Sequence, residues 1–302
     1  MQNEFYIKNI NLLAAGGSGD FLLSYKLKCL LNFLYPEKYI IKNYFCSRPE
    51  TFNIIKTIFP NDPDIIQLPE NYLEDKKTEE SLGNINNFAS RNFIAYPDTL
   101  FRGHGKPTLS EWNINPLMIK QYRVLLGKNK PSGYISFALN SVTNFYTYHS
   151  IPELVTKVAK AFPDRKIFYP LLNRWAGKDV PQPNFGNLPK NVELNINPSF
   201  EKVYEILCKS DHTICTDNLI MHLCGEMFSN HLILDPQYKK PAWESRWRNN
   251  SYYNSIPIES LVDDIVDIVK IQIDSPESQM VSVENFYRKG EVNISQLLLF
   301  KE

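Results

Sequence analysis

The clearest fold signal in the chain is the stretch Asn9-Ile10-Asn11-Leu12-Leu13-Ala14-Ala15-Gly16-Gly17-Ser18-Gly19-Asp20-Phe21-Leu22-Leu23. Its first half is a short apolar run, which predicts a buried strand. Three glycines within four positions then predict a sharp turn that a ligand can approach closely, because glycine tolerates positive φ and has no side chain. After Asp20 the leucines recur at helical spacing. Strand, glycine turn and helix meet where open α/β sheets bind ligands, at the carboxyl end of a strand.

Asp20 stands at the start of this helix, and its position has two interpretations. An acidic residue there stabilises the helix N-terminus by about 0.5–2 kcal/mol. The same carboxylate could instead act as a catalytic group at the ligand site. A dinucleotide fingerprint is not supported, because Leu22 occupies the position of its third glycine. This counts against a nicotinamide-dependent enzyme, and no P-loop lysine follows either.

The totals describe a globular chain with no net charge. Its 302 residues suffice for two lobes or one large α/β domain, and Lys+Arg 33 balance Asp+Glu 33. That balance argues against nucleic-acid binding. The five cysteines form no C-x-x-C pair and have apolar neighbours, which predicts core residues in a reducing compartment. Without a signal-peptide pattern or a long apolar run, we expect a cytoplasmic protein with no membrane span, for which peripheral membrane contact stays open.

The first half of the chain alternates strand and helix patterns. Residues 39–45 and 65–68 read as strands, residues 49–59 as a helix between them, and residues 94–96 as a further short strand. This alternation predicts a parallel sheet with helices on both faces. Asp62-Pro63-Asp64 spells the D-x-D string of metal-dependent glycosyltransferases, but its place between a helix end and a strand start favours a turn.

The second half repeats the alternation after a linker. Glycines, a proline and lysines at 127–133 predict a domain boundary, which gives domains of residues 1–130 and 131–302. Packing of the C-terminal segment back on the first lobe is left open. We expect strands at 134–139, 166–171, 191–194, 211–216 and 231–234, and helices at 152–162, 200–208, 219–228 and 258–273.

Two loops at predicted strand ends of the second half are candidates for binding a donor. One begins with Asn140 and Ser141. The other holds Asp217, Asn218 and Leu219 at a helix start, followed by His222. The backbone N–H groups of this helix could hold a diphosphate, or Asp217 or Asn218 could simply cap it. His222 is either a structural histidine or a ligand contact.

Two further segments combine cations with loop-forming residues. Arg246 and Arg248 lie in a tryptophan-rich segment, and arginine forks bind phosphate bidentately. Arg102 and His104 lie in a glycine-containing loop that could touch an acceptor or a phosphate. An ordinary surface loop explains either segment as well. No Ser/His/Asp arrangement and no zinc-ligand spacing is visible, so hydrolase and metalloenzyme functions have little support.

Three segments together resemble the ADP-heptose:lipopolysaccharide heptosyltransferase family. The first runs from Leu12-Leu13 through Gly19-Asp20 to Tyr35-Pro36, and the second is the strand at 134–139 with its polar loop. The third is Cys215-Thr216-Asp217-Asn218-Leu219-Ile220-Met221-His222-Leu223-Cys224, which looks like the family's Asp-Thr-Gly-x-x-His-x-Ala segment. Order and spacing agree over most of the chain.

The resemblance implies an α/β protein of two Rossmann-like lobes, the glycosyltransferase B architecture, with parallel sheets facing a central cleft. It implies an inverting glycosyltransferase that needs neither metal nor cofactor. A nucleotide-diphosphate sugar would sit on the second lobe, held by Asn140, Ser141, Asp217, Asn218, Leu219, His222, Arg246 and Arg248. A glycan or glycolipid acceptor would bind the first lobe near Gly17, Ser18, Gly19, Arg102 and His104. Asp20 would take the proton of the acceptor hydroxyl.

The sequence also departs from the family. Asn218-Leu219 stand where the family has Thr-Gly, and residues 144–149 lack the lysine that the family offers to the donor. The donor sugar is therefore left open, and Arg246 or Arg248 would have to supply the missing cation. The alternative is a non-catalytic protein that binds a nucleotide or a glycan on the same scaffold.

Overall fold

The computed structural model of the protein divides into two compact units, Met1–Val124 and Leu125–Glu302. The structure describes residues 8–15, 17–72, 94–96, 119, 122–139, 148–171, 174–175, 178–179, 183–227, 229–236 and 254–274. Each unit is described by itself.

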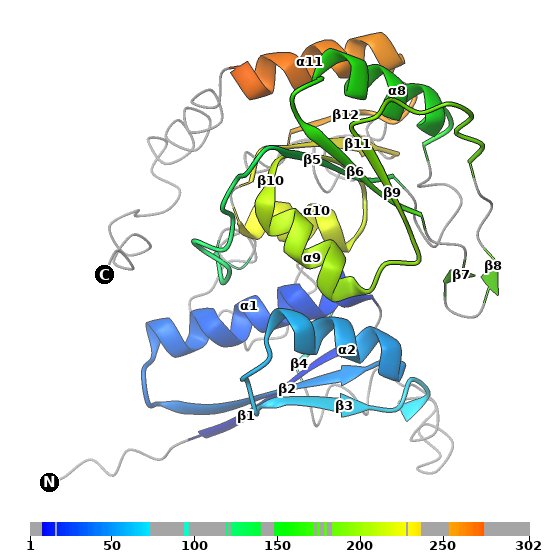
Figure 1. Ribbon diagram of the computed structural model, residues 1–302. Helices are drawn as coiled ribbons and strands as arrows, with labels where there is room; N and C mark the ends of the chain where they lie inside the picture. The colour runs from blue at the N-terminus through cyan, green and yellow to red at the C-terminus, as the bar shows by residue number, and fades with distance from the viewer. Residues whose placement is uncertain are drawn as a thin grey trace, which may run out of the picture. The chain divides into compact units, whose positions relative to one another are not determined.

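Within the described residues, unit 1 is a parallel sheet with two long helices on one face (Figure 1). Along the sheet the strand order is β3-β2-β1-β4. In chain order its elements are β1 (Lys8–Ala15), α1 (Ser18–Leu34), β2 (Tyr39–Cys46), α2 (Pro49–Ile58), β3 (Ile65–Leu68) and β4 (Ile94–Tyr96).

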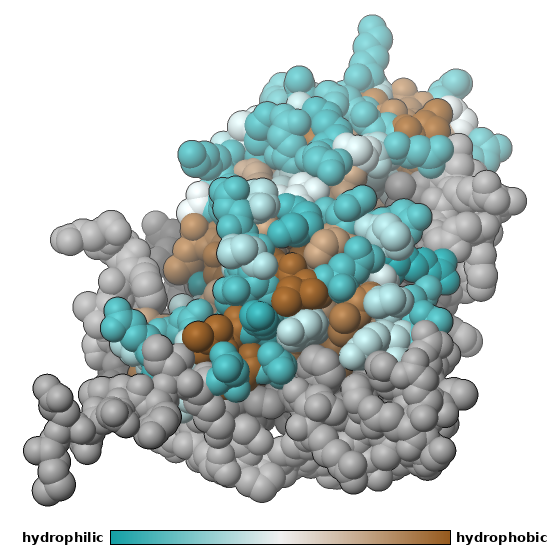
Figure 2. Space-filling view, turned by 90° about the horizontal axis from the view of Figure 1, so that it is seen from below, coloured by the Kyte–Doolittle hydropathy of each residue, from teal (hydrophilic) through white to brown (hydrophobic). Residues whose placement is uncertain are grey.

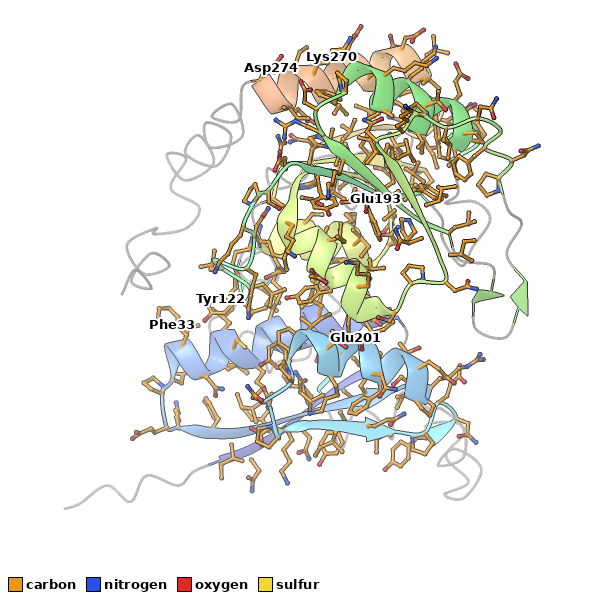
Figure 3. The ribbon with its side chains drawn as sticks, viewed as in Figure 1. Phe33, Tyr122, Glu193, Glu201, Lys270 and Asp274 are labelled. Atoms are coloured by element: carbon orange, nitrogen blue, oxygen red, sulfur yellow. The ribbon has the colours of Figure 1, made fainter. Side chains whose placement is uncertain are left out.

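The helices of unit 1 cover the sheet with the apolar residues that the sequence pattern assigned to them. Phe21 and Leu27 of α1 are completely buried, and the Phe21 ring lies 4.9 Å from that of Phe45 on β2. Helix α2 begins with Pro49, whose fixed φ suits a first helical position. The Phe33 ring at the end of α1 lies 6.2 Å from that of Tyr122 (Figure 3). This contact ties the segment before the unit boundary to α1.

Unit 2 is a six-stranded parallel sheet with helices on both faces (Figure 1). Its strand order is β12-β11-β10-β5-β6-β9, and β7 and β8 form a separate antiparallel pair. In chain order its elements are β5 (Tyr134–Ala138), α8 (Ile151–Ala161), β6 (Lys166–Leu171), β7 (Arg174–Trp175), β8 (Lys178–Asp179), β9 (Val192–Ile196), α9 (Phe200–Lys209), β10 (Ser210–Thr216), α10 (Leu219–Glu226), β11 (His231–Asp235), β12 (Ser255–Pro257) and α11 (Val262–Asp274).

The main core of unit 2 lies between the sheet and the pair α8 and α11. Val155 and Val158 of α8 and Ile265 of α11 are completely buried there. Lys270 and Asp274 lie on α11 at the edge of the unit (Figure 3). The opposite face is covered by α9 and α10, and a smaller cluster of Cys215, Met221 and Ile233 fills the space next to α10.

The segment predicted as a linker is bonded to the end of α9 and to the start of β10. The N–H groups of Lys130 and Ser132 donate to the carbonyls of Cys208 (2.6 Å) and Lys209 (2.9 Å). Gly133 adopts φ +87°, the left-handed region that other residues rarely enter. Its N–H donates to the Asp211 carboxylate at 2.9 Å, so the turn into β5 is fixed by the neighbouring strand.

The prediction of an α/β fold with parallel sheets is confirmed, and most predicted elements occur within two residues of their expected ends. One expectation is wrong: the last helix was predicted to start at Ile258 but starts at Val262. Ser255–Pro257 instead form the edge strand β12, and the Ile258 N–H donates to the Asp235 carbonyl at 3.2 Å. Strands β7 and β8 were not predicted. In unit 1 the two described long helices lie on one face only, not on both.

The surface shows no helix suited to a bilayer: among the described residues, none is long and apolar enough to cross a membrane. On the face seen in Figure 2, hydrophobic residues lie in small groups among hydrophilic ones. The large hydrophobic side chains that are exposed in the described part of the chain are Ile40, Leu126, Ile196, Leu261 and Ile271.

Candidate functional site

Each unit has a junction between a strand and a helix that matches a candidate ligand site of the sequence. In unit 1 it is the turn from β1 to α1, which carries Asp20. In unit 2 it is the turn from β10 to α10, which carries Asn218. Both turns lie at carboxyl ends of parallel strands, where α/β sheets bind their ligands.

Asp20 is the third residue of α1, and its carboxylate lies over the start of the helix. Its Oδ2 accepts the N–H of Gly17 at 2.8 Å, while the Phe21 N–H donates to the Gly17 carbonyl at 3.2 Å. This is the carboxylate half of a capping box. Gly17 has no side chain to supply the other half. Within the described residues the second oxygen, Oδ1, has no hydrogen-bond partner, and Asp20 is partly exposed.

The backbone at Gly17 is ordinary, contrary to the expectation of a positive φ. Its φ of −84° and ψ of 169° are extended values that any residue adopts. An added Cβ would meet only the Asp20 Oδ2 atom, at the ordinary contact distance of 3.7 Å. Gly17 is exposed and Ser18 is buried. What glycine provides here is an open approach to the backbone, not access to a special conformation.

In unit 2 the side chain of Asn218 holds the β10–α10 junction together. Its Oδ1 accepts the N–H groups of Ile220 (2.9 Å) and Met221 (3.4 Å), so Asn218 is the N-cap of α10. Its Nδ2 donates to the Ala138 carbonyl at the end of β5 (2.8 Å) and to Thr216 Oγ1 (3.4 Å). One side chain therefore joins the ends of two neighbouring strands to the start of a helix.

The other predicted donor residues of this junction are close to Asn218 along the chain. Asp217 and Leu219 are half-buried, and His222 is buried within the first turns of α10. The first N–H groups of a helix have no partner inside it. Since Asn218 satisfies those of Ile220 and Met221, the N–H of Leu219 is left to another acceptor.

The remaining predicted site residues lie outside the described part of the chain. They are Asn140, Ser141, Arg246 and Arg248 for the donor, and Arg102 and His104 for the acceptor. Ala138 lies two residues before Asn140, and its carbonyl accepts a hydrogen bond from the residue that caps α10.

The cysteines beside this junction are packing residues. Cys215 on β10 and Cys224 on α10 are completely buried, and every cysteine of the chain is a free thiol. Burial, together with a hydrogen bond to Cys224, raises the pKa of the Cys215 thiol well above its usual value. Cys215 therefore stays protonated and is not a nucleophile.

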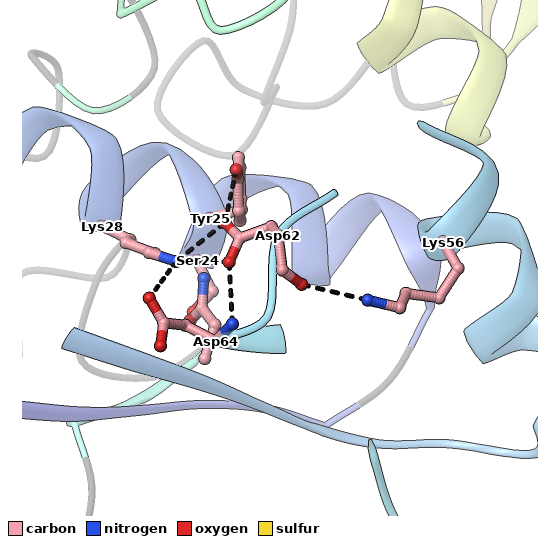
Figure 4. A network of polar contacts seen from close by, with 7 residues as sticks. Ser24, Tyr25, Lys28, Lys56, Asp62 and Asp64 are labelled. Carbon is pink, nitrogen blue, oxygen red and sulfur yellow. Dashed lines mark hydrogen bonds and ion pairs between the residues drawn. The ribbon is translucent and has the colours of Figure 1, made fainter. Parts of the chain in front are cut away.

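The D-x-D string of unit 1 forms a turn that is held by its own neighbours (Figure 4). The Asp62 carboxylate accepts hydrogen bonds from Tyr25 Oη (2.7 Å), from Lys28 Nζ (2.8 Å) and from the Asp64 N–H (2.9 Å). Lys56 Nζ donates to the Asp62 carbonyl at 3.0 Å. Burial alone would raise the pKa of Asp62, but the bonds from Lys28 and Tyr25 outweigh it and lower that pKa.

The turn interpretation of Asp62-Pro63-Asp64 thus accounts for its geometry, since a carboxylate neutralised by lysine is a poor metal ligand. Among the described residues, no group of three or more histidine, cysteine, aspartate or glutamate side chains is arranged to hold a metal ion.

The chain is similar in structure to two solved heptosyltransferases. E. coli heptosyltransferase WaaC with ADP aligns with a TM-score of 0.53 at 11% identity, covering 88% of this chain and 98% of that one. E. coli ADP-heptose lps heptosyltransferase II aligns with a TM-score of 0.50 at 10% identity, covering 89% and 99%. Neither a protein-family model nor a curated protein sequence matches the chain. At such identities the likeness shows the fold, which is the fold that the sequence resemblance implied.

Proposed function

We propose that the chain is a glycosyltransferase that moves a sugar from a nucleoside-diphosphate donor to a hydroxyl group of a glycan or glycolipid, with inversion and without a metal ion. The observation that carries the proposal is the structural likeness to WaaC, which extends over 88% of this chain and 98% of that enzyme. The WaaC structure holds ADP. Two strand–helix junctions support the same function. The β1–α1 turn carries the Asp20 carboxylate, and the β10–α10 turn presents the N-terminus of α10.

The donor is assigned to unit 2, in the role predicted for residues 131–302. The Leu219 N–H, which Asn218 leaves uncommitted, and the positive end of the α10 dipole offer a place for a diphosphate oxygen. Arg246 or Arg248 is proposed as the cation that balances the charge of the leaving diphosphate. Asn140, Ser141, Asp217 and His222 are proposed to complete the donor contacts.

The acceptor is assigned to unit 1, where Asp20 is the proposed general base. Its Oδ2 is held by the Gly17 N–H, which fixes the carboxylate, while Oδ1 remains available for a proton. The acceptor hydroxyl gives its proton to Asp20 as its oxygen bonds to the anomeric carbon. The bond from that carbon to the phosphate oxygen breaks, and the nucleoside diphosphate leaves with the electron pair. Gly17, Ser18, Gly19, Arg102 and His104 are proposed to surround the acceptor.

A non-catalytic nucleotide- or glycan-binding protein is the second candidate. It is favoured by one observation: the bond between Asp20 and Gly17 explains Asp20 as a helix-capping residue without any chemistry. Such a protein would bind a nucleotide but would neither transfer nor hydrolyse a nucleotide sugar.

The test is a ligand screen by thermal unfolding with ADP, UDP, GDP and their common sugar conjugates, each with and without EDTA. A ligand that binds the native state raises the melting temperature. The proposal expects at least one nucleoside diphosphate to stabilise the chain equally with EDTA, and its sugar conjugate to be turned over. Stabilisation without turnover against any glycan acceptor favours the second candidate, and stabilisation that EDTA abolishes contradicts metal independence.

A further inference from the structure

We infer that Asn218 is a positioning residue for donor binding and not itself a donor contact; this inference rests on the proposed function. An asparagine amide offers two acceptor sites on oxygen and two N–H donors on nitrogen. All four are in use within unit 2, by Ile220, Met221, Ala138 and Thr216. A direct bond to a ligand would therefore require one of these bonds to break.

The orientation of this amide is fixed by its neighbours. Oδ1 faces two backbone N–H groups, and Nδ2 faces the carbonyl of Ala138. The flipped amide would place N–H against N–H and oxygen against oxygen, so only the orientation found satisfies the site. No other common helix-capping side chain supplies both functions. Serine, threonine and aspartate accept from the helix, but none of them carries an amide N–H.

The oxygen and the nitrogen of the amide therefore have separate roles. The oxygen caps α10 and leaves the Leu219 N–H uncommitted. The nitrogen bonds the Ala138 carbonyl at the end of β5 and Thr216 Oγ1 at the end of β10, and so holds the backbone two residues before Asn140. The strands β5 and β10 are adjacent in the sheet, and the hydrogen bond between Ser136 Oγ and Thr213 Oγ1 (2.9 Å) joins them further back. The backbone pairing of the two strands ends at Ala138 and Cys215, and the amide of Asn218 adds a side-chain bond at that edge.

The experiment removes the role of the amide nitrogen and keeps the helix cap that the oxygen provides. In Asn218→Ser the hydroxyl still caps the helix, the side chain stays neutral, and the bond to the Ala138 carbonyl is lost. We expect the affinity for the tightest of ADP, UDP and GDP, measured by isothermal titration calorimetry, to fall about five- to tenfold. The melting temperature should fall by no more than a few degrees, because serine is as good an N-cap as asparagine and only the bonds of the amide nitrogen are lost.

The matched control is Ser199→Ala. Ser199 Oγ accepts the Lys202 N–H at 3.3 Å and caps α9, which follows β9, and β9 is separated from β10 by β5 and β6. This variant should lower the melting temperature by about 2–4 °C and leave nucleotide affinity at the wild-type value. A purely structural role of Asn218 would give both variants the same pattern, a change in stability without a change in affinity.

A second variant covers the case in which Asn218→Ser does not fold. Asn218→Asp keeps the size and both accepted bonds but has no N–H for Ala138. Its loss of affinity must persist in about 0.5 M salt, where simple charge repulsion of a diphosphate is screened.

Wild-type affinity in either variant, or a loss in Asn218→Asp that salt removes, overturns the inference and leaves the proposed function standing. A wild-type chain that binds none of the three nucleotides overturns both.

Discussion

The Gly17 N–H and the Asp20 Oδ2 are joined by a 2.8 Å hydrogen bond across the first turn of α1. The bond is compatible with two different roles of Asp20. It explains Asp20 as a capping residue, and it also holds the carboxylate in one orientation, as a general base requires. Only a substitution that keeps the acceptor while removing the basicity can tell these roles apart.

Asp20→Asn is that substitution. The amide oxygen still accepts the Gly17 N–H, but the side chain can no longer take a proton from an acceptor hydroxyl. We expect sugar transfer to fall by a factor of about 10²–10⁴, the usual contribution of a general base, with nucleotide affinity unchanged. The rate is measured by release of the nucleoside diphosphate.

Glu50→Gln is the matched control, since Glu50 is the first-turn acid of α2 in the same unit. It removes a comparable charge from a helix N-terminus and should leave turnover intact. If Asp20→Asn turns over as fast as this control, Asp20 is only a cap.

The ion pair of Lys28 with Asp62 is expected to stabilise unit 1 strongly. Lys28 Nζ lies 2.8 Å from Asp62 Oδ2, and the two side chains are only 7% and 15% exposed. Lys28→Met removes the cation and leaves a largely buried carboxylate with Tyr25 and a backbone N–H as partners. We expect the free energy of unfolding, measured by urea denaturation, to fall by about 3 kcal/mol.

The same substitution at an exposed pair provides the comparison. Lys270 pairs with Asp267 on the outer side of α11, where the side chains are 47% and 69% exposed. Lys270→Met should cost less than about 0.5 kcal/mol. Equal costs for Lys28→Met and Lys270→Met would mean that burial does not strengthen the role of Lys28.

The buried His212 predicts a dependence of stability on pH. Burial, with smaller contributions from the charges of His231 and Arg165, lowers its pKa from 6.5 to about 4 in spite of a hydrogen bond to Gln272. Between these two values the unfolded chain binds more protons at this residue than the folded chain. The stabilising contribution is therefore complete above pH 6.5 and is lost as the pH falls from 6.5 to 4, by about 3 kcal/mol.

His212→Gln removes this titration and keeps a polar group near Gln272. Its free energy of unfolding should change less between pH 7 and about pH 4.5 than that of the wild type. His149→Gln, at an exposed position, should keep the wild-type dependence. If His212→Gln follows the wild-type curve, the buried imidazole does not cause the loss.

The thiols supply a test of the packing itself. Cys46, Cys215 and Cys224 are buried, whereas Cys29 and Cys208 are partly exposed. Brief alkylation of the native chain with iodoacetamide, followed by mass spectrometry, should modify Cys29 or Cys208 well before the other three. Early modification of Cys215 would show that the β10–α10 junction opens readily.

Much of this fold can be predicted because the signals are local. Apolar runs bounded by proline or glycine mark β1, β2 and β3 within one or two residues. The start of α11 could not be placed, because Ile258 continues the helical apolar spacing although a preceding strand pairs with β11. The spacing of apolar residues indicates which side of a helix is buried. It does not indicate whether the residues before the helix pair with another strand.

The candidate site could likewise be predicted from the sequence only in part. That Asp20 and Asn218 stand at helix starts is visible in the sequence, because both follow a strand pattern and precede a helix pattern. That the Asn218 nitrogen bonds the Ala138 carbonyl is not visible, since it depends on β5 and β10 being neighbours in the sheet. Strand order is a property of the whole unit.

The bond between Ala138 and Asn218 spans 80 positions of the chain, and this separation has a consequence for biosynthesis. A nascent polypeptide that has emerged as far as α8 and β6 already contains β5, but the bond from Asn218 to the Ala138 carbonyl at the end of that strand is still missing. Only after β10 and its following helix leave the ribosome does the junction close. Premature termination anywhere before that point should yield a product without the junction to which the donor is proposed to bind, however well its earlier segments have folded.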